Sequence, residues 1–142
     1  AVVTVMRTPY WSAIGFRLIA LMGIALMAYY VPKLAAFHGI DPAASLWLST
    51  LNPLVLLHFS LGGHNDTLMV GLTLMGLHYA TRRRALPAAL ALAAAVAVKP
   101  IALVAVPFAA LLFLPITASL LKWLVAYAVS GLLVLGVVVL GG

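Results

Sequence analysis

The chain has 142 residues, of which 66% are apolar and 7% are charged, whereas a soluble domain carries about 25% charged residues. A core this small cannot bury so many apolar side chains, because a domain of about 150 residues still exposes roughly a third of the surface of its unfolded chain. The composition therefore excludes an ordinary soluble globule and indicates a lipid surrounding. The net charge of +6 comes from basic residues scattered between apolar runs, which argues against a nucleic-acid partner. Because the chain has no cysteine, disulfides, thiolate nucleophiles and cysteine zinc sites are also excluded.

A series of apolar runs predicts an all-α fold, a polytopic membrane bundle of about five or six helices, some of them short or kinked. In chain order, the runs cover residues 12–32, 43–61, 67–80, 85–98, 101–116 and 120–142. Residues 33–42 are predicted to be a polar connection. Pro53 is expected to kink the second run, because a proline removes a backbone hydrogen-bond donor. The third run is short for a hydrocarbon core of about 30 Å.

The basic residues predict how the helices are oriented in the plasma (inner) membrane. Short loops rich in Lys and Arg stay in the cytoplasm, so Arg82, Arg83 and Arg84 are predicted to be cytoplasmic. Lys33 then also lies inside, and the polar break at residues 62–66 lies outside. Two arrangements remain open at Lys99-Pro100: a hairpin, which the same rule favours, or one kinked helix.

The polar break holds the first candidate site. His64, Asn65 and Asp66 follow two glycines and bring together an imidazole, an amide and a carboxylate, which can hydrogen-bond a sugar or a phosphate. The simpler interpretation is that Asn65 or Asp66 caps the next helix, and the two roles do not exclude each other. One carboxylate and one imidazole are too few ligands for a metal site.

Lys99 is the second candidate, because an ammonium group at membrane depth is costly without an anionic partner or a water-filled cavity. Its natural partner is a phosphate, although its stem could also let it snorkel to the interface. Arg17 is a weaker phosphate candidate, for which snorkelling is the better explanation. Asn52 is predicted to bond a carbonyl freed by the adjacent proline, and His58 could reach the outer cavity.

These residues occur in a recognisable order. Leu51-Asn52-Pro53-Leu54 is followed by Gly63-His64-Asn65-Asp66 and then by an Ala-rich run that ends in Val98-Lys99-Pro100. This order resembles the GT-C class of membrane glycosyltransferases that use polyprenyl-phosphate sugars. More closely, it resembles the actinobacterial polyprenol-phosphomannose-dependent α-1,6-mannosyltransferases that build the lipomannan backbone. The resemblance covers nearly the whole chain.

The resemblance implies an inverting transfer of a sugar, mannose, from a polyprenyl-phosphate donor to a hydroxyl of a cell-envelope glycolipid or glycan on the outer face. By motif position, the resemblance implies that His64, Asn65 and Asp66 line the substrate pocket and that Lys99 approaches the donor phosphate. The reasoning from the residues themselves adds Asn52 and His58 as substrate-binding candidates and Arg17 as a second phosphate candidate. The general base of this class has no counterpart here, so we expect it outside the 142 residues, with Asp66 as the fallback. No cofactor is implied, and a divalent cation is left open.

Two other functions remain as alternatives: a transporter or lipid-flippase subunit, and a non-catalytic scaffold subunit of a membrane complex. A transporter would spread polar residues through several helices, whereas here they gather at the outer ends. The chain begins without a methionine and stops at an apolar run. We therefore expect residues 1–142 to form a single transmembrane region, a central fragment of a larger membrane enzyme.

Overall fold

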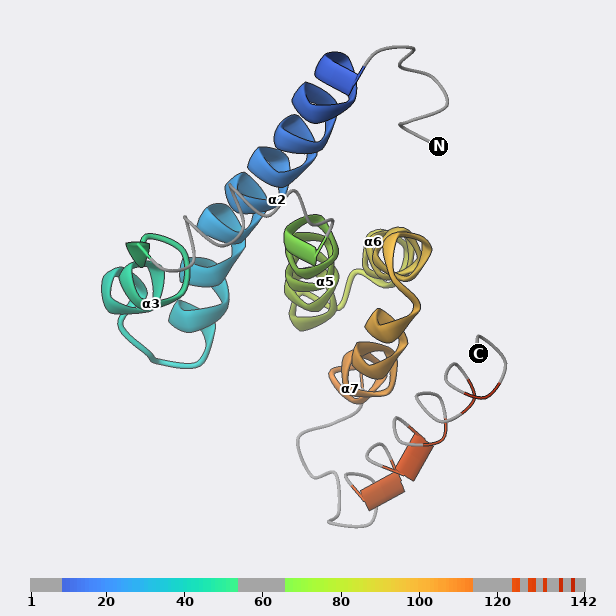
Figure 1. Ribbon diagram of the computed structural model, residues 1–142. Coiled ribbons are helices and arrows are strands. Elements are labelled where there is room, and N and C mark those ends of the chain that lie inside the picture. Colours follow the sequence, from blue (N-terminus) through green and yellow to red (C-terminus); the bar gives the residue numbers. More distant parts are fainter. Residues whose placement is uncertain are drawn as a thin grey trace.

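The computed structural model describes residues 9–53 and 66–113 and, beyond them, scattered positions between 124 and 139. Within these residues all regular structure is helical (Figure 1), which confirms the predicted all-α class for this part of the chain. The helices are α2 (Pro9–Phe37), α3 (Pro42–Ser49), α5 (Asp66–Thr81), α6 (Ala85–Val98), the 3-10 helix η1 (Pro100–Val104) and α7 (Ala105–Leu111). Most of the run predicted at 120–142 lies outside the described residues.

Helix α2 is longer than the predicted run 12–32, because it continues through Pro32 to Phe37. The ammonium of Lys33 lies 3.4 Å from the centre of the Tyr29 ring, one helical turn earlier, where a cation is attracted to the ring face. The prediction that Lys33 belongs to a connecting loop was therefore wrong. The segment Ile14–Phe37 is long and apolar enough to cross a membrane.

The connection from α2 to α3 is short and is shaped by local capping. Gly39 has φ of +71°, and Gly39 and Ile40 donate hydrogen bonds to the carbonyls of Ala36 and Ala35, the pattern that ends many helices. The carboxylate of Asp41 then accepts from the backbone N–H groups of the first turn of α3, at 3.0 and 3.4 Å. Asp41 is thus a helix N-cap.

Helix α3 ends at Ser49, before Pro53. The predicted single helix over 43–61 with a kink at Pro53 was wrong in this respect: a break at residues 50–52 separates α3 from Pro53. The physical reason is that the residue before a proline disfavours the helical conformation. Residues 54–61 lie outside the described part of the chain.

Helices α2 and α5 pack closely side by side (Figure 1). A Cβ at Gly23 would meet the backbone of Thr67, and a Cβ at Gly71 would meet Leu26. Further along, the Tyr30 and His78 rings have centroids 5.3 Å apart. The contacts follow the same order in both helices, so α2 and α5 run in the same sense. Small residues at such crossings let helix backbones approach each other in membrane proteins.

Helices α5 and α6 form an antiparallel pair, and the chain then turns back again. Arg83, in the turn after α5, donates from Nη1 to the carbonyl oxygen of Phe113 at 3.1 Å. Ala80, Ala88 and Ala109 also share one buried cluster, so α7 returns alongside α5 and α6. Of the two arrangements left open at Lys99-Pro100, the structure has the hairpin.

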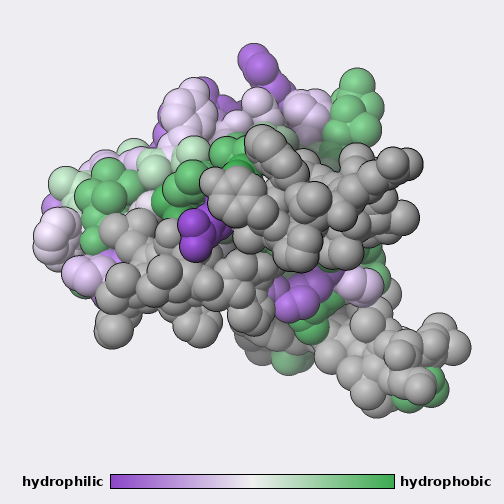
Figure 2. All heavy atoms as spheres, turned by 45° about the horizontal axis from the view of Figure 1, so that its top comes forward, coloured by the Kyte–Doolittle hydropathy of each residue, from purple (hydrophilic) through white to green (hydrophobic). Residues whose placement is uncertain are grey.

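Many large apolar side chains are exposed on these helices, and Figure 2 shows green, apolar areas among polar ones on one face. Leu18, Trp47, Leu48, Leu86 and Leu90 are each at least 60% exposed. A soluble monomer rarely exposes large contiguous apolar patches. This surface therefore agrees with the lipid surrounding that the composition indicates.

Candidate functional site

The two polar residues singled out in the sequence, Asp66 and Lys99, form an ion pair. The ammonium Nζ of Lys99 donates a hydrogen bond to Oδ1 of Asp66 across 33 residues of sequence. The Asp66 side chain is 31% exposed and that of Lys99 is 50% exposed, so the pair lies at an accessible end of the α5–α6 hairpin. The anionic partner that Lys99 requires is thus present within the chain.

Local backbone structure places each member of the pair. Asp66 is the first residue of α5, where a negative charge is favoured by the helix dipole. Lys99 follows the last residue of α6 in an extended conformation with φ of −152° and ψ of 120°, which the following Pro100 favours. A positive charge at this end of α6 is likewise favoured. Because α5 and α6 are antiparallel, the two ends meet.

The pair leaves hydrogen-bonding capacity unused. An ammonium group has three N–H donors and a carboxylate accepts through two oxygens, whereas the described contact uses one donor and one oxygen. The carboxylate holds the ammonium in place, and the remaining N–H groups of Lys99 can bind a second anion. A phosphate oxygen is a suitable acceptor for such a charge-assisted hydrogen bond.

An apolar groove of about 560 Å³ runs between α6 and α7. Val96 and Leu103, close in sequence to Lys99, belong to its lining, and so do Ala85 and Phe113 near the opposite end of the hairpin. The remaining lining residues are Ala88, Ala89, Leu92, Ala93, Val106, Ala109 and Ala110. The groove therefore offers apolar surface along the hairpin, from its Lys99 end towards the arginine turn.

The other predicted site residues fall into two groups. His58, His64 and Asn65 lie outside the described residues, so their prediction stays untested. Arg17 is exposed on α2, and within the described ranges it forms no ion pair. Asn52 is half-buried in the break before Pro53. Among the described residues, no three His, Cys, Asp or Glu side chains lie close enough together to hold a metal ion.

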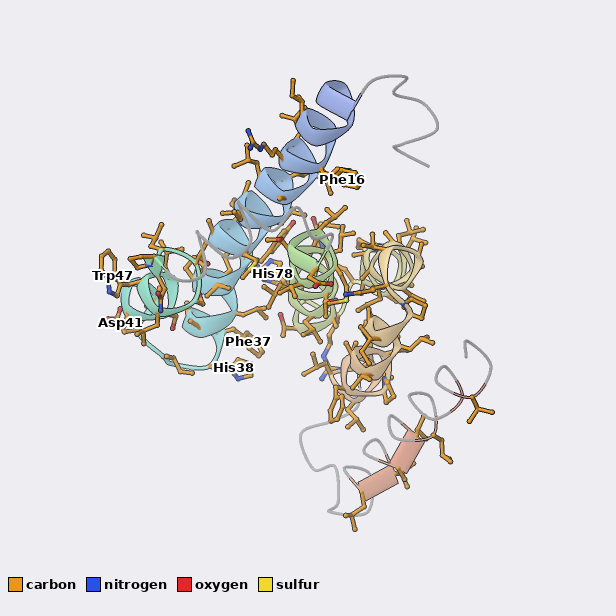
Figure 3. All side chains as sticks on the ribbon, in the orientation of Figure 1. Phe16, Phe37, His38, Asp41, Trp47 and His78 are labelled. Atoms are coloured by element: carbon orange, nitrogen blue, oxygen red, sulfur yellow. The ribbon has the colours of Figure 1, made fainter. Side chains whose placement is uncertain are left out.

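A second polar site was missed in the sequence. Lys33, His78, Tyr79, Arg82 and Arg84 line a pocket of about 200 Å³ at the arginine end of the hairpin. Figure 3 shows His78 between α2 and α5. His78 and Arg82 are four residues apart and so share a helix face, but nothing local in the sequence indicated that Lys33 would join them.

Comparison with known proteins supplies the family. Residues 1–115 match the family model described as "Alpha-(1->6)-mannopyranosyltransferase, N-terminal domain". The chain is 32% identical over 97 residues to alpha-(1->6)-mannopyranosyltransferase A of Corynebacterium glutamicum, covering 68% of this chain and 20% of that protein. It is 40% identical over 92 residues to the protein of the same name from Mycobacterium tuberculosis, covering 65% of this chain and 18% of that protein.

The chain thus spans about a fifth of the length of these relatives. No solved structure matches it. The family match extends over α2, α3, α5, α6 and α7, and it therefore includes both members of the Asp66–Lys99 pair. The chain belongs to the alpha-(1->6)-mannopyranosyltransferase family.

Proposed function

We propose that this chain is part of a membrane mannosyltransferase that moves mannose, with inversion, from a polyprenyl-phosphate donor to a hydroxyl of a cell-envelope glycolipid or glycan. The family membership and the names of the relatives support mannosyl transfer. The observation that carries the choice of donor is the Asp66–Lys99 pair, together with an apolar groove whose lining includes Val96 and Leu103 on either side of Lys99 in the sequence. A lipid phosphate needs both a cationic contact and an apolar surface for its chain.

In this proposal Lys99 binds the phosphate of the donor. The acceptor hydroxyl oxygen attacks the anomeric carbon, the bond from that carbon to the phosphate oxygen breaks, and the hydroxyl proton passes to a general base. Negative charge grows on the departing polyprenyl phosphate, where a preorganised ammonium lowers the barrier. Asp66 positions Lys99, and the groove between α6 and α7 takes part of the polyprenyl chain.

The other predicted site residues complete the proposal. His64 and Asn65 immediately precede Asp66 and would bind donor or acceptor hydroxyls, and we keep His58 and Asn52 as further candidates for substrate binding. Arg17 would be a second contact for the phosphate. We expect the general base outside the 142 residues, with Asp66 as the fallback.

The proposed topology places the enzyme in the inner membrane as a multi-pass protein. Lys33, Arg82 and Arg84 share one end of the helices, and Asp66 and Lys99 share the other end of the hairpin. Because loops rich in Lys and Arg remain cytoplasmic, the ion pair faces the outer side, where the acceptor is expected.

Variants of the pair in the full-length protein test this function. Mannose transfer from polyprenyl-phosphomannose is measured in membranes for Asp66→Asn, Lys99→Met and the swapped double variant Asp66→Lys/Lys99→Asp. Asp41→Asn is the matched control, because Asp41 is the other acidic residue in the chain and asparagine caps a helix about as well as aspartate. Protein amounts are compared by immunoblot.

We expect Lys99→Met to lose about tenfold or more of the transfer rate, the range for a charge-assisted contact. The swapped variant restores an ion pair but moves the ammonium away from the phosphate, so we expect it to stay impaired. Full recovery in the swapped variant would mean that the pair only joins α5 to α6. Unchanged transfer in both single variants would refute the site.

A further inference from the structure

The pocket at the arginine end of the hairpin concentrates positive charge without a carboxylate to balance it. Lys33 comes from α2, Arg82 follows α5, and Arg84 precedes α6. The chain has two acidic residues in all, and both are occupied elsewhere: Asp66 pairs with Lys99, and Asp41 caps α3. Like charges that share a small pocket repel each other, so a bound anion would stabilise it.

The pocket also holds a buried polar atom that lacks a partner. His78 is 8% exposed and lines the pocket, and its Nδ1 has no hydrogen-bond partner among the described residues. Buried polar atoms are nearly always hydrogen-bonded, so an orphaned one indicates an absent ligand, water or ion. The ring packs against Tyr30 at a centroid distance of 5.3 Å, which restricts its movement.

The size of the pocket and the cationic side chains that line it indicate that the bound anion is a phosphate. About 200 Å³ is the room of several water molecules at about 30 Å³ each, enough for a phosphate group with part of its hydration. Guanidinium groups match the oxygens of phosphate with two parallel hydrogen bonds, and lysine adds a mobile point charge. Lys33 contacts the Tyr29 side chain, and because an ammonium group has three N–H donors, it can also donate to an anion in the pocket.

We infer that Lys33, Arg82 and Arg84, together with His78, bind a phosphate group at the end of α2 and α5 opposite to the Asp66–Lys99 pair. The expected source is the headgroup of an anionic phospholipid, because Leu86, two residues after Arg84, is an exposed apolar side chain of the kind that a membrane interface covers. The same chemistry would accept a soluble phosphate. The site is separate from the proposed transfer site and does not depend on it.

The test measures ligand-induced stabilisation of the full-length protein in a neutral detergent. Unfolding midpoints are recorded against increasing short-chain phosphatidylglycerol, short-chain phosphatidylcholine and inorganic phosphate at constant ionic strength. A ligand that binds the folded protein raises the midpoint with its concentration. The variants are Lys33→Gln, Arg84→Gln and His78→Phe, and the last of these keeps an aromatic ring against Tyr30.

Arg83→Gln is the matched control, because Arg83 belongs to the same turn but contacts the carbonyl of Phe113 rather than the pocket. Comparing shifts rather than absolute midpoints removes any direct effect of a variant on stability. We expect phosphatidylglycerol to bind the wild type and Arg83→Gln alike, and to bind Lys33→Gln and Arg84→Gln about tenfold or more weakly. The affinity of His78→Phe for phosphatidylglycerol should lie between that of the wild type and that of the Lys33→Gln and Arg84→Gln variants.

The outcomes separate the sources and can overturn the inference. If inorganic phosphate raises the unfolding midpoint as much as phosphatidylglycerol does, the site is supported and its ligand is a soluble phosphate. Equal stabilisation of all variants by phosphatidylglycerol, or an equal loss in Arg83→Gln and Arg84→Gln, would show only general attraction between an anionic lipid and a basic loop. No anion-induced stabilisation of the wild type would also refute the site.

Discussion

Replacing Gly23 by leucine tests the close packing of α2 against α5. A Cβ at this position would lie 2.4 Å from the carbonyl carbon of Thr67 and 2.5 Å from the nitrogen of Leu68. Non-bonded carbon atoms prefer about 3.5–4.0 Å, so the two helices must separate by about 1 Å. The atoms in the way belong to the backbone of α5, and a change of side-chain rotamer cannot relieve the contact.

The expected cost follows from these distances. Overpacking typically costs about 1–3 kcal/mol, and a clash with backbone belongs at the upper end of that range. Leucine recovers about 1 kcal/mol in helix propensity relative to glycine. We therefore expect the free energy of unfolding to fall by about 2 kcal/mol, which is about a 30-fold change in the folding equilibrium.

The assay is unfolding of the full-length protein in detergent micelles with increasing SDS, followed by circular dichroism. Ala25→Leu is the control, because Ala25 lies on the exposed side of the same helix and surface changes usually stay within about 0.5 kcal/mol. If Gly23→Leu unfolds at the same SDS fraction as Ala25→Leu, the close approach of α2 and α5 is wrong. Since Thr67 follows Asp66, we also expect Gly23→Leu to disturb the ion pair and thereby to slow the mannose transfer that we propose.

Two further predictions concern helix ends. Asp41→Ala removes the N-cap of α3 and should lower the free energy of unfolding by about 0.5–2 kcal/mol, whereas Asp41→Asn should leave it unchanged. The same SDS titration compares the two variants, and equal unfolding midpoints would contradict the capping role of Asp41. Arg83 has φ of 55°, a conformation that costs a residue with a Cβ about 1–2 kcal/mol. Both Arg83→Gly and Arg83→Ala lose the hydrogen bond to Phe113, but Arg83→Gly should be more stable than Arg83→Ala by about 1 kcal/mol. Thermal unfolding measures the difference, and the opposite order would contradict the left-handed conformation at Arg83.

Local signals were enough to predict the all-helical class and several helix positions. The runs predicted at 67–80 and 85–98 correspond to α5 (Asp66–Thr81) and α6 (Ala85–Val98). The arginine triplet separates α5 from α6, and Lys99-Pro100 ends α6, because charge and a proline act within about one helical turn. The family resemblance also followed from the order of motifs along the chain.

Other local signals were ambiguous. Pro32 and Lys33 suggested the end of a helix, but α2 continues to Phe37, because its stopping point is set by the turn at Gly39. Pro53 suggested a kink, but the helix ends ahead of it. A proline restricts its neighbours without deciding whether the chain bends, continues or breaks, and that choice depends on packing around it.

The sequence alone showed that Asp66 and Lys99 are charged residues in an apolar chain, where an unpaired charge is energetically unfavourable. It did not show that the two residues pair with each other. That required α5 and α6 to lie antiparallel, with Gly76 against Leu92, so that residues 33 positions apart meet. The basic pocket likewise joins Lys33 of α2 to the turn after α5. Charge and hydrophobicity are properties of each residue, whereas the partner of a charge depends on how helices cross, which only the tertiary structure decides.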